Sequence, residues 1–322
     1  MTPPVQRRLT IEHTSEFCYR ETVKGSLLML RLRPRQSTLV RLLDFALHID
    51  PVTVPVAFDD SFGNTCYVAN IHRRHRRIHV RSLSQVAVSA PPECSGQAPA
   101  WDALAKLADP VRYWEFLNPS HLVFPCEALD SFITTHGICR GTDPLSSLRD
   151  TASTLHKAFA YEPGSTEVHS SVEHILKTGR GVCQDYTHVL LAIGRSWGIP
   201  GRYVSGYLHN EGMSGEQSSA SASHAWAEFL LPGLGWVGVD PTNNTLADHR
   251  HVPVAIGRDY VDAAPTRGTV FGGGESTLVV RVSVTESDKP GSAAPVHIER
   301  RVLTHFAPVP PAQKIVSGQQ DQ

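Results

Sequence analysis

The sequence predicts an α+β fold, in which an N-terminal β-sandwich-like domain precedes a domain where a cysteine-bearing helix packs on an antiparallel sheet. Residues 9–90 alternate short apolar runs with Pro, Gly, Asn and Asp, which is typical of strands joined by turns. Residues 101–197 contain segments with helical texture, and three strand-like runs follow over residues 201–240. A chain of 322 residues is long for one hydrophobic core, so two domains are expected.

Composition and charge exclude several classes of protein. The chain is 41% hydrophobic and 19% charged, as in ordinary globular proteins, and its net charge is −1. A chain with almost no net charge produces no overall electrostatic field that would attract nucleic acid or anionic lipid, so neither a nucleic-acid partner nor a membrane is expected. The sequence contains no apolar run of bilayer-spanning length and no secretory signal at its start. We therefore expect a cytoplasmic protein with reduced thiols.

The first domain is expected over residues 1–95. Four apolar runs in it are predicted to be strands: residues 27–32, 39–49, 52–58 and 86–88. The sequence DDSFGN at residues 59–64 predicts a tight turn. The sequence HRRHRR at residues 72–77 is a local basic patch with strand-like flanks, which predicts a solvent-exposed edge strand and leaves anion binding as the alternative.

The second domain is expected over residues 96–290. Its longer helices are predicted at residues 101–107, 127–134, 145–159 and 184–197. A capping signal, SSVE at residues 170–173, predicts one further short helix. Strands are predicted at residues 201–208, 224–231, 236–240 and 278–284. Residues 291–322 are expected to add a C-terminal strand and a disordered tail.

Cys183 is the candidate nucleophile. It follows the bend GRG at residues 179–181 and directly precedes the clearest predicted helix of the chain. A helix N-terminus presents free N–H groups and the positive end of the macrodipole, and both stabilise a thiolate. The alternative is a buried structural cysteine, as expected for most of the six cysteines. No C-x-x-C pair is present, so no structural metal site is expected.

His224 and Asp240 complete a candidate catalytic set. His224 opens a strand after a Gly- and Ser-rich loop, where its ring could act as a base at the end of a sheet. Asp240 ends the next strand, because Pro241 stops the pairing there. In an antiparallel hairpin the carboxylate would lie beside the imidazole and fix its tautomer. The alternative for His224 is that it is one of 17 histidines without a catalytic role. The alternative for Asp240 is a simple turn residue.

The order Cys, His, Asp on a helix start and two hairpin strands resembles the transglutaminase-like core of the papain-like superfamily. Segments similar to bacterial transglutaminase-like proteins are GVCQD (181–185), GIP (198–200), RYVSGY (202–207), HAW (224–226), DPT (240–242), GRDY (257–260) and APTRG (264–268). Segments similar to that family's N-terminal β-domain and bridging segment are HT (13–14), LR (30–31), PR (34–35), FGN (62–64) and LNPS (117–120). The resemblance covers about residues 9–285. It departs at Gly201, where alanine is usual, and at Asn244, where glycine often follows.

The resemblance implies acyl transfer through a thioester, with Cys183, His224 and Asp240 as catalytic residues. It does not imply calcium dependence, and no cofactor is expected. The implied partner is a peptide or protein amide substrate, and the Cys183 N–H is the implied first donor to the oxyanion. The second donor is undetermined. Tyr161 lies upstream and could approach the cleft, with a core aromatic as the alternative. The substrate, the choice between hydrolysis and transamidation, and the oligomeric state stay open. The rival hypothesis is a catalytically silent binding module that reuses the fold.

Overall fold

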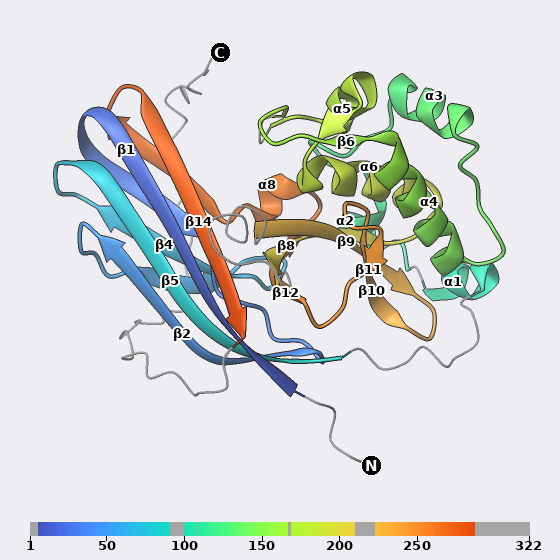
Figure 1. The fold of residues 1–322 in the computed structure, drawn as a ribbon, viewed down its shortest axis with the longest axis horizontal. Coiled ribbons are helices and arrows are strands. Elements are labelled where there is room, and N and C mark those ends of the chain that lie inside the picture. The colour runs from blue at the N-terminus through green and yellow to red at the C-terminus, as the bar shows by residue number, and fades with distance from the viewer. Residues whose placement is uncertain (1–5, 91–99, 108, 167–168, 210–222, 287–322) are drawn as a thin grey trace.

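The computed structural model describes residues 6–90, 100–107, 109–166, 169–209 and 223–286. A long bent sheet lies beside a smaller sheet that is covered by helices (Figure 1). The α+β prediction is therefore confirmed. Within the described residues, no helix is both long and apolar enough to cross a membrane.

The central strand of the first sheet is β1 (Gln6–Leu30). Successive parts of it pair antiparallel with β4 (Thr65–Ile71) and β5 (His75–Ser89). The same parts also pair antiparallel with β13 (Thr266–Gly272) and β14 (Ser276–Glu286). Because a strand has two edges, β13 and β14 occupy the edge opposite β4 and β5. The predicted domain bounds at residues 95 and 290 stay a prediction, but strand pairing places residues 266–286 on the first sheet.

The first sheet bends and buries a core between its own parts. Its outer strands are β2 (Val40–Asp50), which pairs with β5, and β3 (Val56–Asp59), which pairs with β4. Phe45 of β2 nevertheless stacks on Tyr67 of β4, with the ring centroids 5.5 Å apart. This packing agrees with a sandwich-like domain. The predicted strand at residues 52–58 begins only at Val56, because Pro55, directly before it, cannot donate to a ladder.

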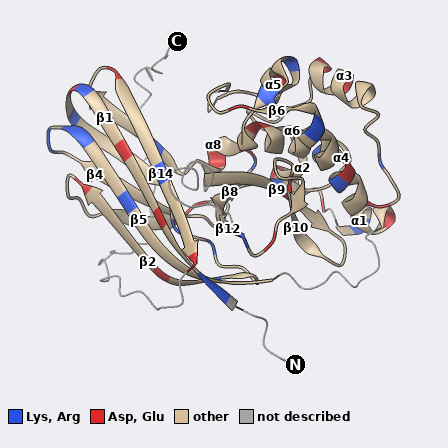
Figure 2. Cartoon of the chain, in the orientation of Figure 1, with Lys and Arg blue, Asp and Glu red and all other residues tan. Residues whose placement is uncertain are grey.

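The basic patch at residues 72–77 comprises the connection between β4 and β5 (residues 72–74) and the first three residues of β5, so the predicted edge strand covers only its second half. Strand β2 pairs with β5 only from His79 onward, so the first residues of β5 have a free edge on that side, as predicted. His75 is buried and its Nε2 contacts Ser26 Oγ at 2.9 Å. Arg77 forms an ion pair with Glu16 at 2.6 Å. Basic and acidic residues are interspersed over this sheet (Figure 2), which favours a solvated surface over an anion site.

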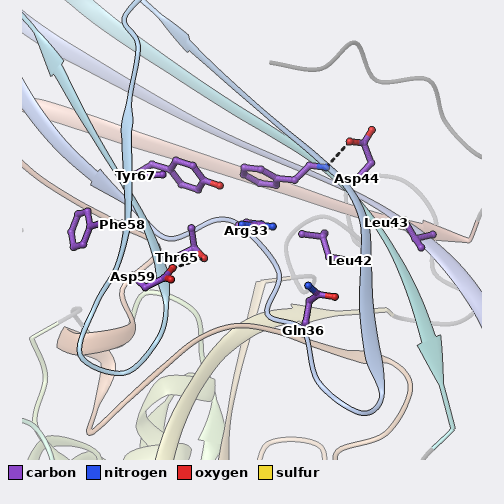
Figure 3. Close-up of a pocket in the computed structure, with 11 residues that line it drawn as sticks. Arg33, Gln36, Leu42, Leu43, Asp44, Phe58, Asp59, Thr65 and Tyr67 are labelled. Carbon is purple, nitrogen blue, oxygen red and sulfur yellow. Dashed lines mark hydrogen bonds between the residues drawn. The ribbon is translucent and has the colours of Figure 1, made fainter. Parts of the chain in front are cut away.

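A cavity of about 360 Å³ lies within the first domain (Figure 3). Its walls come from β2, β3, β4 and the segment between β1 and β2, and they include Arg33, Asp44 and Tyr67. None of the residues that line it belongs to the candidate catalytic set.

The second sheet is antiparallel and has the strand order β11-β10-β9-β8-β12. Its strands are β8 (Gly201–Leu208), β9 (Ser223–Leu231), β10 (Gly235–Asp240), β11 (Thr245–Leu246) and β12 (His251–Gly257). A separate short parallel pair joins β6 (Ala160–Tyr161) to β7 (Arg180–Gly181). The helices are α1 (Trp101–Leu107), α2 (Trp114–Leu117), α3 (Glu127–Thr135), α4 (Pro144–Ala158), α5 (Val172–Thr178), α6 (Cys183–Ser196) and α8 (Tyr260–Ala263). The four longer predicted helices and the three hairpin-region strands begin and end within one residue of their predicted bounds.

Close packing of α6 on the second sheet requires small residues at the contact. A Cβ on Gly194 would lie 2.3 Å from a ring atom of Phe229, and one on Gly201 would lie 2.7 Å from the same ring. Both glycines therefore make room for Phe229, which is fully buried. The room needed for Phe229 is therefore the physical reason for glycine at position 201, where alanine is usual.

The two sheets are held against each other by apolar and polar contacts. Leu9 and Ile11 of β1 share a buried cluster with Tyr207 of β8 and Val252 of β12. Asn64, which ends the FGN turn, donates to the carbonyl of Ile256 and accepts from its N–H, both at 2.8 Å. The first domain thus braces the sheet that carries the candidate site.

Candidate active site

Cys183 lies at the start of α6 because the preceding turn is tightly specified. Gly179 ends α5 in the left-handed region, with φ of 67°. A Cβ on Gly181 would lie 2.7 Å from Ile175 and 2.9 Å from Asp185, so only glycine fits. The Asp185 carboxylate accepts from the Val182 N–H at 2.8 Å and closes the first turn of the helix. The half-buried Cys183 is the first residue of α6, which begins one residue before its predicted start at residue 184, so the cysteine lies at a helix N-terminus as predicted.

His224 and Asp240 meet as the hairpin prediction requires. The pairing of Val239 with Ala227 sets the register of β9 and β10. In this register the two polar side chains lie on one face, and the Nε2–H of His224 donates to Asp240 Oδ2 at 2.7 Å. Both side chains are buried, with exposed fractions of 7% for His224 and 0% for Asp240.

The Asp240 carboxylate is surrounded by donors. Its Oδ1 accepts from the backbone N–H groups of Thr242 at 3.0 Å and Asn243 at 3.1 Å. Its Oδ2 accepts from the Asn243 side-chain amide at 2.7 Å and lies 3.2 Å from His251 Nε2. Burial disfavours the charged carboxylate, but the charge and hydrogen bond of His224 and the contact with His251 outweigh it. They hold the pKa of Asp240 well below its ordinary value.

His224 carries a proton at neutral pH in this environment. Burial lowers its pKa, but the charge and hydrogen bond of Asp240, followed by a hydrogen bond to Cys183, raise that pKa to about 10. Because Nε2 is engaged by Asp240, Nδ1 is the nitrogen left for Cys183. An imidazolium beside a cysteine stabilises the thiolate, which is the nucleophilic form. The arrangement can therefore support an imidazolium–thiolate pair.

The ion pair predicts a specific loss of stability at alkaline pH. The pKa of His224 is raised in the folded chain, so its contribution is fully present below about pH 6.5 and is lost as the pH rises towards 10. We expect the free energy of unfolding to fall by on the order of a few kcal/mol across this window. Urea unfolding of the wild type and of His224→Gln over a pH series measures it. Equal pH slopes for the two proteins would contradict the expectation.

The charge of Cys183 affects the pKa values of three tyrosines. Burial, and then the charge of Cys183, raises the pKa of Tyr161 to about 12. Tyr203 and Tyr260 also have raised pKa values, chiefly through burial and next through Cys183. Tyr161 pairs with Gly181 in the β6–β7 ladder and is 52% exposed, so it is not a core aromatic. Its neutral hydroxyl is available as a donor at pH 7.

The two tryptophans of the hairpin have different environments. Trp226 is 1% exposed and packs beside the rings of His224 and His251, with centroids 6.2 and 5.1 Å away. Trp236 is half-buried and lies under the Arg202 guanidinium at 4.0 Å. Trp226 therefore supports the candidate site, whereas Trp236 packs near the tip of the hairpin.

Sequence reasoning missed two residues of the site, Asn243 and His251. Asn243 follows the DPT motif, so its proximity to Asp240 was a signal that could have been used. His251 is 11 residues from Asp240 and begins β12, which pairs with β8 and not with β10. Since its contact is tertiary, no local pattern indicates it.

The same cluster has the composition of a metal site. One ligand atom each of His224, Asp240 and His251 lies within 4.8 Å of the others, and all three residues are buried. Both imidazoles, however, direct Nε2 at the same carboxylate oxygen, at 2.7 and 3.2 Å. These hydrogen bonds account for the close approach without an ion.

Comparison with protein families matches both parts of the chain. A family model of the transglutaminase-like superfamily matches residues 134–241, the segment that contains Cys183, His224 and Asp240. A second model, of the bacterial transglutaminase-like N-terminal region, matches residues 9–87. The resemblance stated from the motifs is thus confirmed for both regions.

Several relatives are similar over most of the chain. An uncharacterised protein of Mycobacterium tuberculosis is 32% identical over an alignment of 289 residues that covers 84% of this chain and 90% of that protein. One from Mycobacterium leprae is 31% identical over 282 residues and is covered to 98%. A protein-glutamine gamma-glutamyltransferase of Pseudomonas aeruginosa is 33% identical over an alignment of 97 residues that covers 27% of this chain and 14% of that enzyme.

Among solved structures, a protein of Cytophaga hutchinsonii with a proposed assignment as a cysteine protease has a similar fold. The TM-score is 0.71 at 17% sequence identity, and the match covers 89% of this chain and 93% of that one. At this identity the likeness shows a shared fold.

Proposed function

Because the chain belongs to the transglutaminase-like superfamily, we propose that it is a cysteine-dependent acyl-transfer enzyme acting on peptide or isopeptide amide bonds through a thioester. The observation that carries this proposal is the 2.7 Å hydrogen bond between buried His224 and Asp240, with Cys183 at a helix start against the same ring. A catalytically silent binding module does not require this arrangement, in which an imidazole with a raised pKa faces a thiol.

The first half of the proposed reaction forms the thioester. The Cys183 thiolate attacks the amide carbonyl carbon, and the negative charge moves to the carbonyl oxygen. The Cys183 N–H lies in the first turn of α6, where backbone donors lack intrahelical acceptors, so it can bind this oxyanion. The His224 imidazolium then donates its Nδ1 proton to the leaving nitrogen. The C–N bond breaks, and an amine or ammonia departs.

The second half resolves the thioester. His224, now neutral, accepts a proton from water or from an amine, and the resulting nucleophile attacks the thioester carbonyl. The C–S bond breaks and the thiolate and imidazolium are restored. Water yields a free acid, whereas an amine yields a new amide. Asp240 holds the ring in place throughout and stabilises its positive charge.

Incubation of the purified chain with a panel of peptide amides tests this function. The panel includes peptides with glutamine side chains, as the Pseudomonas relative acts as a protein-glutamine gamma-glutamyltransferase. We expect free acid and ammonia without added amine, an amine adduct when a primary amine is present, and neither with Cys183→Ala. Mass spectrometry of the peptides reads these products. A cytoplasmic location for the substrate is part of the same proposal.

If no peptide is converted and wild-type Cys183 is also no more reactive towards iodoacetamide than in the unfolded chain, the enzyme proposal fails. The binding-module hypothesis then takes its place. Fast alkylation without conversion of this panel would instead direct the search to other acyl donors.

A further inference from the structure

His251 supports Asp240 from a strand that does not neighbour β10. Its Nε2 lies 3.2 Å from Asp240 Oδ2, the same oxygen that accepts from His224. The imidazole is 4% exposed and packs edge-on against Trp226, with centroids 5.1 Å apart. The side chain is therefore held in one orientation by its neighbours.

Asp248 determines which nitrogen of His251 carries the proton. The Asp248 backbone N–H donates to His251 Nδ1 at 3.1 Å, so in a neutral ring Nδ1 is the acceptor and Nε2 carries the hydrogen. In a charged ring, Nδ1–H faces Asp248 Oδ1 at 3.2 Å and Nε2 again carries a hydrogen. In both states Nε2–H donates to Asp240.

Asp248 itself is held in place. Its carboxylate accepts from the Arg250 backbone N–H at 2.9 Å and pairs with the Arg250 guanidinium. The interactions form a connected series from Arg250 through Asp248, His251 and Asp240 to His224. A cavity of about 560 Å³ reaches His251 from the side of the first domain. The titratable and charged groups that face His251 or line this cavity are Asp240, His224, Asp248, Arg250, Arg35, Arg202 and Glu228.

We propose that His251, oriented by Asp248, is a positioning residue that keeps the Asp240 carboxylate aimed at His224. The inference rests on the proposed thiol chemistry and extends it by one residue pair. Without the His251 donor, Asp240 Oδ2 accepts only from His224 and the Asn243 amide, so the carboxylate is oriented less tightly towards His224. A less well-oriented carboxylate stabilises the imidazolium less, and the imidazolium in turn stabilises the neighbouring thiolate less.

The test measures the rate at which iodoacetamide alkylates Cys183 as a function of pH, with the labelled peptide identified by mass spectrometry. For His251→Met, which fills the space without donating, we expect the midpoint of the profile to rise by about one pH unit. The rate at neutral pH is expected to fall about tenfold, as for loss of one charge-assisted hydrogen bond. His251→Gln keeps an N–H donor and is expected to restore most of the rate.

Two further variants distinguish an effect on the orientation of Asp240 from an effect of misfolding. Asp248→Ala removes the carboxylate but keeps the backbone N–H, so a smaller shift in the same direction is expected. His136→Met, at the exposed end of α3, is the matched control and is expected to leave the profile unchanged. Thermal melts report folding separately. A purely structural role for His251 would lower the melting temperature without moving the midpoint.

The inference is overturned if folded His251→Met shows the wild-type midpoint, or if Asp248→Ala and His251→Met shift it in opposite directions. Its failure is distinguishable from failure of the proposed function. In the latter case wild-type Cys183 itself shows no enhanced alkylation at neutral pH, whereas in the former the wild type is reactive and the variants match it.

Discussion

Replacing Cys183 with alanine is expected to lower turnover by at least about 10⁴-fold, because no other group can form the thioester. The fold should persist. Cys183 is half-buried at the periphery of the apolar core, and its Sγ contacts a ring that Asp240 also holds. The cost in unfolding free energy is expected to be about 1 kcal/mol. Product formation by mass spectrometry and urea unfolding measure the two quantities.

Cys139→Ala is the matched control for this substitution. Cys139 is an exposed free cysteine between α3 and α4, so its loss removes a thiol of equal size without touching the site. We expect wild-type turnover and wild-type stability for it. Retention of substantial turnover by Cys183→Ala, with the control unchanged, would exclude a thioester at Cys183.

Asp240→Asn is expected to lower turnover by roughly 10³- to 10⁴-fold and also to destabilise the fold. The reason lies in the donors around the carboxylate. If the new amide oxygen faces His224, its NH₂ group faces the backbone N–H groups of Thr242 and Asn243. If the amide is turned round, its NH₂ group faces the donors of His224 and His251. In either orientation the new NH₂ group faces other hydrogen-bond donors. The Asp240 side chain has no exposed surface, so this conflict is buried.

The unfavourable donor–donor contacts in Asp240→Asn are expected to lower the unfolding free energy by roughly 3–5 kcal/mol, by analogy with removing one partner of a buried ion pair. Asp143→Asn provides the control, since Asp143 is the N-cap of α4 and asparagine caps a helix equally well. Steady-state kinetics and urea unfolding on both variants measure the effects. Wild-type turnover in Asp240→Asn would show that the carboxylate does not orient His224.

Local features of the site could be predicted because they depend on neighbouring residues in the chain. The glycine bend before Cys183, the helix that follows it and the hairpin from β9 to β10 were all indicated by residue type and spacing. Their bounds in the structure agree within one residue. The hairpin brings His224 and Asp240 together because its turn joins two adjacent strands, which restricts the register.

The departure from the family pattern at Asn244 also has a local explanation. Among the described residues it is the one non-glycine residue with a positive φ, at 51°. Glycine and asparagine tolerate this region best, which explains why asparagine can stand where glycine often does. Glycine in the family and asparagine in this chain both indicate a positive φ at position 244.

By itself, the sequence determined the α+β class, a helix with Cys183 at its N-terminal end and the hairpin that joins His224 to Asp240. Only the tertiary structure decided that β13 and β14 return to β1, that Trp226 is buried beneath the site and that His251 contacts Asp240. The physical reason is the range of the interactions. Turns, caps and periodic apolar faces are set by residues a few positions apart, whereas sheet order and buried polar contacts depend on which distant surfaces pack together.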